Sequence, residues 1–159
     1  MKELSTNPED RLGVYKHIDD LPTHHRLRQY ADEYAGRDVW KEYVEETNLY
    51  ERYSSPRFKP ATARAVDSWK THVEERGRHH ALATPADINT WCGELLTDRS
   101  NRTVYNLYWT RLATFYDWLR WHTDHPHTYD PFLMAAHEYT DSAAGHVWVG
   151  KIGQRRDAE

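Results

Sequence analysis

The run from Arg102 to about Trp121 contains neither glycine nor proline, and it constrains the fold of this chain more than any other feature. Val104, Tyr108 and Leu112 recur at the spacing of one face of an α-helix. Four aromatic side chains widen this face beyond a single stripe: Tyr105, Trp109, Tyr116 and Trp118. A helix that is apolar over so much of its circumference is buried on more than one side, so the sequence predicts the central helix of a helical domain.

Capping signals predict three further helices around it. An apolar stripe runs over residues 63–73, and Gly77 follows where a left-handed cap would end that helix. Thr84-Pro85-Ala86-Asp87 has the residues of a second helix start, Ser100-Asn101 is the cap signal of the long helix, and Asp130-Pro131 begins a short fourth helix. We therefore predict an all-α fold with a four-helix bundle between about residues 60 and 139.

The rest of the chain divides at proline and glycine. We predict a helical N-terminal extension over residues 1–55, a core helical domain over 56–139 and a C-terminal arm and tail over 140–159. In the extension the apolar pattern fits two short helices or one helix bent at Gly36. In the arm, residues 146–152 are β-prone and flanked by glycine, so we predict one short strand or an extended arm there.

Composition limits the class of protein. The chain has 159 residues, which suits one domain with an appendage, and 21 basic against 25 acidic residues leave a net charge of −4. Any nucleic-acid surface must therefore be a local patch. A single cysteine, Cys92, excludes an internal disulfide framework and a cysteine zinc finger. No apolar run is long enough to span a membrane and the first ten residues do not resemble a signal peptide, so we expect a cytoplasmic protein.

The sequence offers little for catalysis or metal binding. Three of the eleven histidines lie with Asp124 in the segment 122–127, but Pro126 interrupts them, and we expect a solvated loop with no metal. His24-His25 and His79-His80 are expected at the surface near helix ends. No phosphate-binding glycine loop, zinc-protease motif or serine-hydrolase motif is present, no cofactor is expected, and Cys92 is expected to be an inert buried thiol.

Residues 60–139 resemble a known family. Thr84-Pro85-Ala86-Asp87-Ile88, then Ser100-Asn101-Arg102, then Arg111-Leu112-Ala113-Thr114-Phe115-Tyr116-Asp117-Trp118-Leu119 follow the order seen in the core-binding (SAM-like) domain of tyrosine recombinases and phage integrases. The family closes with Asn-Pro where this chain has Asp130-Pro131. The resemblance covers about half of the chain, and the alternative is a helical bundle that shares only its caps.

The resemblance implies double-stranded DNA binding linked to the integration or recombination of a mobile element. In that family the catalytic Arg/Lys/His/Arg set and the nucleophilic Tyr lie in a second domain, and about 20 residues after the match leave no room for it. We therefore expect no enzymatic activity. His25-Arg26-Leu27-Arg28 has the family's His-x-x-Arg spacing but lies before the matching region, so we interpret it as an exposed helix face. The expected partners are duplex DNA and a catalytic recombinase or a second copy of the chain.

The expected DNA contacts gather at the start of the long helix, where free backbone N–H groups and the helix dipole favour a phosphate. Backbone contacts from the first helix and the preceding linker, including Arg57, are expected to add to them. The predicted DNA-binding residues are Arg99, Asn101, Arg102, Thr103, Asn106, Thr110, Arg64, Lys70 and Lys59.

A second class of function stays open from sequence. The same fold can serve as a protein–protein adaptor or oligomerisation module without binding DNA. Four aromatic residues of the extension would then form the interface: Trp40, Tyr43, Tyr50 and Tyr53.

Overall fold

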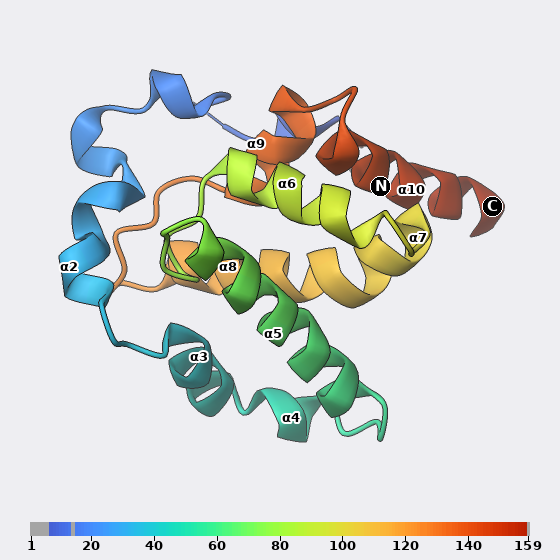
Figure 1. Cartoon of the computed structure of the whole chain (residues 1–159), viewed down its shortest axis with the longest axis horizontal. Helices are drawn as coiled ribbons and strands as arrows, with labels where there is room; N and C mark the ends of the chain where they lie inside the picture. The colour runs from blue at the N-terminus through green and yellow to red at the C-terminus, as the bar shows by residue number, and fades with distance from the viewer. Residues whose placement is uncertain (1–6, 14, 159) are drawn as a thin grey trace, which may run out of the picture.

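The computed structural model describes residues 7–13 and 15–158, which form helices and loops without a strand (Figure 1). The all-α prediction is confirmed. None of the helices in this part of the chain has the length and apolar character needed to cross a membrane.

Four elements follow one another over the core segment. They are α5 (Phe58–Glu75), α6 (Pro85–Leu95), a continuous helical run made of α7 (Asn101–Val104), η4 (Tyr105–Trp109) and α8 (Thr110–Trp121), and α9 (Pro131–Glu138). In Figure 1, α5 crosses the long run formed by α7, η4 and α8, and it packs against η4 and α8. Gly77 has a φ of 78° just after α5, as predicted.

Shorter elements precede this segment. They are α1 (Pro8–Arg11), the 3-10 turns η1 (Ile18–Asp20), η2 (Thr23–His25) and η3 (Leu27–Tyr30), and then α2 (Ala31–Tyr34), α3 (Val39–Thr47) and α4 (Leu49–Arg52). The chain around Gly36 joins two separate helices, α2 and α3, instead of bending one helix.

The long helix contains one feature that the sequence did not predict. Residues 105–109 form a π-helical turn, η4, in which the helix widens. This turn opens the carbonyl oxygen of Asn106 to side chains, and it accepts hydrogen bonds from Thr110 Oγ1 (2.9 Å) and Arg111 Nη1 (2.8 Å). The widened turn therefore fixes the guanidinium of Arg111.

Aromatic side chains fill the core where these helices meet. Trp69 of α5 contacts Trp91 of α6 with ring centroids 4.9 Å apart, and both are fully buried. The indole of Trp69 and the hydroxyl of Tyr116 both donate to the carbonyl oxygen of His80, at 2.9 and 2.8 Å. The turn between α5 and α6 is therefore attached to two core helices at one atom. Cys92 is buried on α6, as predicted.

The start of α6 is held by a buried carboxylate. The carboxylate of Asp87 accepts from the backbone N–H (2.8 Å) and the hydroxyl (3.0 Å) of Thr84, and it pairs with Arg76 and Arg78 at 2.5 and 2.6 Å. Burial acts to raise the pKa of Asp87, but the hydrogen bonds from Arg76 and Thr84 outweigh it and lower the pKa below its ordinary value. The predicted cap is present and is stronger than the sequence indicated.

The extension packs on the long helix through aromatic rings. Trp40 and Tyr43 of α3 lie 5.3 and 5.4 Å from Phe115 of α8, and both are buried. They are therefore core residues, and the prediction that they form an exposed adaptor surface is wrong. Tyr50 is half-buried, and only Tyr53 of the four aromatic residues remains largely exposed.

His80 fixes the start of α3 and is not a surface residue, contrary to the prediction. Its Nε2 accepts hydrogen bonds from the backbone N–H groups of Val39 (3.1 Å) and Trp40 (3.2 Å). Burial lowers the pKa of His80 to about 3, so the ring is neutral and able to accept. The local N-cap of α3 is Asp38, whose carboxylate accepts from the backbone N–H of Lys41 at 3.1 Å. His80, 40 residues away, adds an acceptor for the two preceding N–H groups, which no local pattern could show.

The C-terminal arm is helical, so the predicted strand over residues 146–152 is wrong. Helix α10 runs over Ala143–Ala158, and Val147 and Trp148 are buried against the rest of the core. Its glycines allow close packing instead of marking strand ends: a Cβ on Gly145 would lie 2.1 Å from the carbonyl oxygen of Thr140. Tertiary packing thus overrides the local β-propensity of this segment.

We predict that Asp87→Ala lowers the free energy of unfolding by about 2–3 kcal/mol, because the cap of α6 and two partly shielded ion pairs are lost together. Urea unfolding followed by tryptophan fluorescence measures this. Asp98→Ala is the control, since Asp98 forms only an exposed pair with Arg99, and it should cost less than about 0.5 kcal/mol. Equal losses of unfolding free energy in the two variants would contradict the assignment of Asp87 as the residue that holds the start of α6.

Stability should also fall on acidification. Burial lowers the pKa of His80 to about 3 and that of His127 to about 4, whereas unfolded imidazoles titrate near 6.5. The unfolded state therefore binds more protons below pH 6.5, and each histidine costs up to about 1.4 kcal/mol per pH unit as the pH falls. Burial raises the pKa of Asp130 to about 6, which opposes this trend below pH 6.

Comparison of variants separates these contributions. His80→Asn keeps an acceptor near the start of α3 but does not titrate, so its unfolding free energy should depend less steeply on pH between 6.5 and 5 than that of the parent. His24→Asn, at an exposed position, should follow the parent. Parallel curves for the parent and His80→Asn would show that His80 is not held neutral.

Candidate nucleic-acid interface

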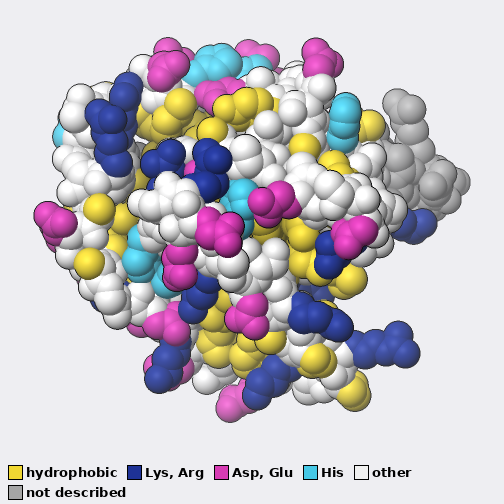
Figure 2. Space-filling view, viewed as in Figure 1, with side chains coloured by type: hydrophobic (Ala, Val, Ile, Leu, Met, Phe, Trp, Pro, Cys, Tyr) yellow, Lys and Arg dark blue, Asp and Glu magenta, His cyan; other side chains and the backbone are white. Residues whose placement is uncertain are grey.

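The segment from Arg52 to Val66 contains four basic residues and no acidic one. It covers the end of α4, the connecting loop and the first half of α5. Its basic side chains are all exposed, and none forms an ion pair within the part of the chain that the structure describes: Arg52, Arg57, Lys59 and Arg64. We call residues 52–66 the basic segment. Figure 2 shows Lys and Arg side chains standing out at the lower right, where Figure 1 places the start of α5.

Aromatic rings support the basic segment. Tyr53 stacks on Phe58 with centroids 4.9 Å apart and planes at 29°. The guanidinium of Arg52 lies over the Tyr53 ring at 5.7 Å, and the ammonium of Lys59 lies over Tyr50 at 5.2 Å. These cation–π contacts orient two of the cations without neutralising their charge.

Arg111 of α8 reaches the same place from the long helix. Its guanidinium lies 4.9 Å from the Phe58 ring centroid, and Nε donates to Thr62 Oγ1 at 3.3 Å. The side chain is half-buried and has no carboxylate within ion-pair distance among the described residues. Burial lowers the pKa of Arg111 from its ordinary value. Arg111 is thus a fifth uncompensated cation beside the basic segment.

Sequence reasoning did not assign Arg111 to the DNA-binding set. It appeared only as the first residue of the family-like motif on the long helix. Its position depends on the π-helical turn and on the crossing of α5, so residue spacing alone gave no signal for it.

Part of the predicted set comes together here. Lys59 and Arg64 belong to the basic segment. Arg111 bonds to Thr62 of that segment and to two predicted residues of the long helix, at Asn106 O and Thr110 Oγ1. Arg64 lies about 200° around α5 from Thr62 and therefore on the opposite face of that helix.

The other predicted residues lie apart. Lys70 is eleven residues beyond Lys59, about 16 Å along α5, and pairs with Asp38 at 2.9 Å. Arg99 pairs with Asp98 at 2.7 Å and lies over the Tyr108 ring. Arg102 is exposed and forms no ion pair in the described structure, but it lies about 13 Å along the helix from Arg111.

The start of the long helix is already partly capped. Ser100, not Asn101, is the N-cap: its Oγ accepts from the backbone N–H of Thr103 at 3.1 Å and also lies 3.1 Å from the Thr103 hydroxyl. Asn101 lies beside α10, where a Cβ on Gly150 would come within 2.9 Å of the Asn101 Cβ. This helix start is therefore less open to a phosphate than the sequence suggested.

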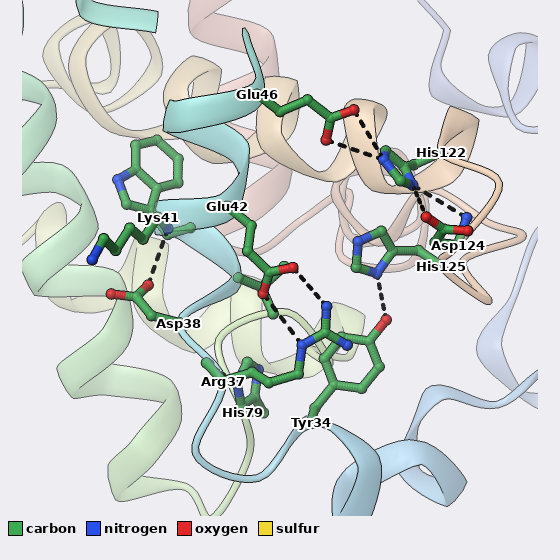
Figure 3. A network of polar contacts seen from close by, with 12 residues as sticks. Tyr34, Arg37, Asp38, Lys41, Glu42, Glu46, His79, His122, Asp124 and His125 are labelled. Atoms are coloured by element: carbon green, nitrogen blue, oxygen red, sulfur yellow. Dashed lines mark hydrogen bonds and ion pairs between the residues drawn. The ribbon is translucent and has the colours of Figure 1, made fainter. Parts of the chain in front are cut away.

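The histidine-rich loop joins the extension to the core. His122 lies 3.1 Å from both carboxylate oxygens of Glu46, and His125 Nδ1 lies 2.5 Å from the hydroxyl of Tyr34 (Figure 3). His127 donates from Nε2 to the carbonyl oxygen of Ala81. No group of three or more His, Cys, Asp or Glu side chains among the described residues is arranged to hold a metal ion. Thr123 and Asp124 are exposed, as a solvated loop requires, whereas His127 is buried, and the loop also connects elements distant in sequence.

Comparison with protein-family models found no match, and neither did comparison with curated proteins or with solved structures. The interpretation of the site therefore depends on the chain's own geometry and charge.

We predict that Ser100→Ala lowers the free energy of unfolding by about 1 kcal/mol, because the N-cap of the long helix is lost. Asn101→Ala, one position further along, should cost less than about 0.5 kcal/mol. Urea unfolding of the two neighbouring variants checks this. A larger loss for Asn101→Ala would identify Asn101 as the cap.

Proposed function

We propose that this chain binds double-stranded DNA through the basic segment and Arg111. The observation that carries the proposal is the distribution of uncompensated charge. Ion pairs occupy seven cations elsewhere in the described structure: Arg37, Lys41, Lys70, Arg76, Arg78, Arg99 and Arg120. None of these belongs to the basic segment. Among the described cations outside these ion pairs, Lys16, Arg26, Arg28 and Arg102 lie elsewhere, whereas Arg52, Arg57, Lys59, Arg64 and Arg111 lie within or beside the basic segment and form the largest local group, even though the whole chain carries −4.

The chemistry of this surface suits a phosphate backbone. Exposed Lys and Arg side chains without acidic partners release counterions when they meet phosphates, which is the main source of sequence-independent affinity. Lys59 is exposed near the start of α5, and Asn106 is exposed on the neighbouring helix. We propose that side chains from these two crossing helices approach one stretch of duplex. Phosphate contacts carry no sequence information, so we propose sequence-tolerant or modestly specific binding.

The resemblance to integrase core-binding domains supports the same proposal from a different direction. We propose that the four helical elements of residues 56–139 form a SAM-like binding module that acts in integration or recombination of a mobile element, with a catalytic recombinase or a second copy as partner. We propose no strand cleavage by these residues, because the resemblance covers only the binding half of such enzymes. The adaptor alternative has less support, because two of its four interface residues, Trp40 and Tyr43, are buried in the core.

We predict that fluorescence anisotropy with a labelled 20-base-pair duplex shows binding that weakens steeply with salt. With about four or five phosphate contacts, log K should fall with log salt at a slope near −4. Arg64→Ala and Lys59→Ala should each weaken binding to all sequences and flatten the slope by about 1.

Lys70→Ala is the matched control, because Lys70 lies on the same helix but is paired with Asp38. It should leave the slope unchanged, and circular dichroism should confirm that all three variants stay helical. If Lys70→Ala flattens the slope and Arg64→Ala does not, the contact face is misplaced. Absence of duplex binding together with self-association would favour the adaptor.

A further inference from the structure

A small pocket opens beside the basic segment, between α3 and α4 on one side and α5 and α8 on the other. Its volume is about 220 Å³. Its lining contains aromatic rings, threonine hydroxyls and two guanidinium groups but no carboxylate: Trp40, Tyr43, Leu49, Arg52, Tyr53, Phe58, Thr62, Thr110, Arg111 and Thr114. A pocket with two formal positive charges and no acidic side chain favours an anionic ligand.

Arg111 is arranged to receive that ligand. Thr62, Asn106 and Thr110 fix its Nε and Nη1, whereas Nη2 has no hydrogen-bond partner among the described residues. Burial of a guanidinium without a counter-charge is costly. A phosphate oxygen at Nη2 would offset that cost, and Arg52 on the opposite side of the pocket is also free of carboxylate partners.

The aromatic side of the pocket suits a flat ring. The guanidinium of Arg111 lies over the Phe58 ring, and Phe58 stacks on Tyr53. The guanidinium of Arg52 lies over the Tyr53 ring. Tyr53 is 49% exposed, the most exposed aromatic ring of this group. Exposed aromatic rings next to cations form the usual stacking platform for unpaired bases.

The volume limits the size of the ligand. Pockets for drug-sized ligands measure roughly 300–1,000 Å³, so about 220 Å³ suits a single ring with one phosphate and is too small for a dinucleotide cofactor. A base pair within a stacked duplex cannot enter a pocket of this size, because its bases are not free.

We infer that this pocket binds one unpaired nucleotide, with the phosphate at Arg111 and Arg52 and the base on Tyr53. Because Phe58 stacks on Tyr53 and the Arg52 guanidinium lies over the same ring, the base takes the place of the Arg52 guanidinium on the ring, and the guanidinium turns to the phosphate. The inference rests on the proposed function and extends it: the basic segment holds the duplex, and the pocket holds a nucleotide at a frayed or single-stranded end. A free nucleoside monophosphate has the same chemistry and is a second source of the ligand.

The test compares three labelled duplexes of equal length that end bluntly, in a three-nucleotide single-stranded overhang, or in the same overhang without bases. The parent should bind the overhang about tenfold more tightly than the blunt end, which is the gain expected from stacking one base. The abasic overhang should bind like the blunt end. Thymidine monophosphate should compete for the overhang and leave blunt-end binding unchanged.

Variants assign the effect to the pocket. Tyr53→Ala and Phe58→Leu should reduce the ratio of overhang affinity to blunt-end affinity to about 1, whereas Tyr53→Phe should preserve this ratio. The ratio is the readout because the two rings also orient Arg52 and Arg111, so the blunt-end affinity itself falls as well. Arg57→Ala is the control, because Arg57 belongs to the basic segment but does not line the pocket; it should weaken all three duplexes equally.

The outcomes separate this inference from the proposed function. Equal affinity of the parent for the blunt end and the overhang would overturn the pocket and leave duplex binding in place. Binding of the overhang without binding of the blunt end would support the pocket and contradict the proposed duplex binding. A preference that survives both Tyr53→Ala and Phe58→Leu, or that the abasic overhang also shows, would overturn the stacking role.

Discussion

The arrangement of this protein depends on the hydrogen bonds of His80, whose imidazole is neutral. Its Nε2 accepts the first two N–H groups of α3, and its carbonyl oxygen accepts from Trp69 and Tyr116. One residue thereby joins the extension, α5 and α8. Because α3 is held in this position, α4 and the basic segment lie beside Arg111. The surface that we propose for DNA therefore depends on a buried histidine that does not touch it.

Local signals were sufficient for the elements that are fixed by local physics. The Thr84–Asp87 cap, the Gly77 terminus and the Asp130-Pro131 start were all predictable, because capping and left-handed φ depend on residues a few positions apart. Features that depend on contacts between residues distant in sequence could not be predicted in this way. The β-prone arm becomes α10 through packing, and Trp40 becomes a core residue only because α3 meets α8.

The predictions for the candidate site divide in the same way, into those that local sequence supports and those that depend on the fold. Asn106 and Thr110 were predicted on the long helix, and Arg111 joins them to Thr62 of the basic segment, which also contains the predicted residues Lys59 and Arg64. Lys70 and Arg99 were predicted on equal grounds, but carboxylates that are near in space neutralise them. Sequence identifies which residues are charged, whereas only the fold determines which charges remain uncompensated. In an acidic chain that difference decides where a polyanion can bind.

The most direct test of this account is a titration of the isotope-labelled chain with duplex DNA, followed by amide chemical shifts in NMR. The account predicts that the largest shifts cluster in residues 52–66 and around Arg111, with little change at Lys70 and Arg99. Shifts concentrated at Arg99 to Thr103 would contradict the placement of the interface, and the absence of any shift at low salt would contradict DNA binding itself.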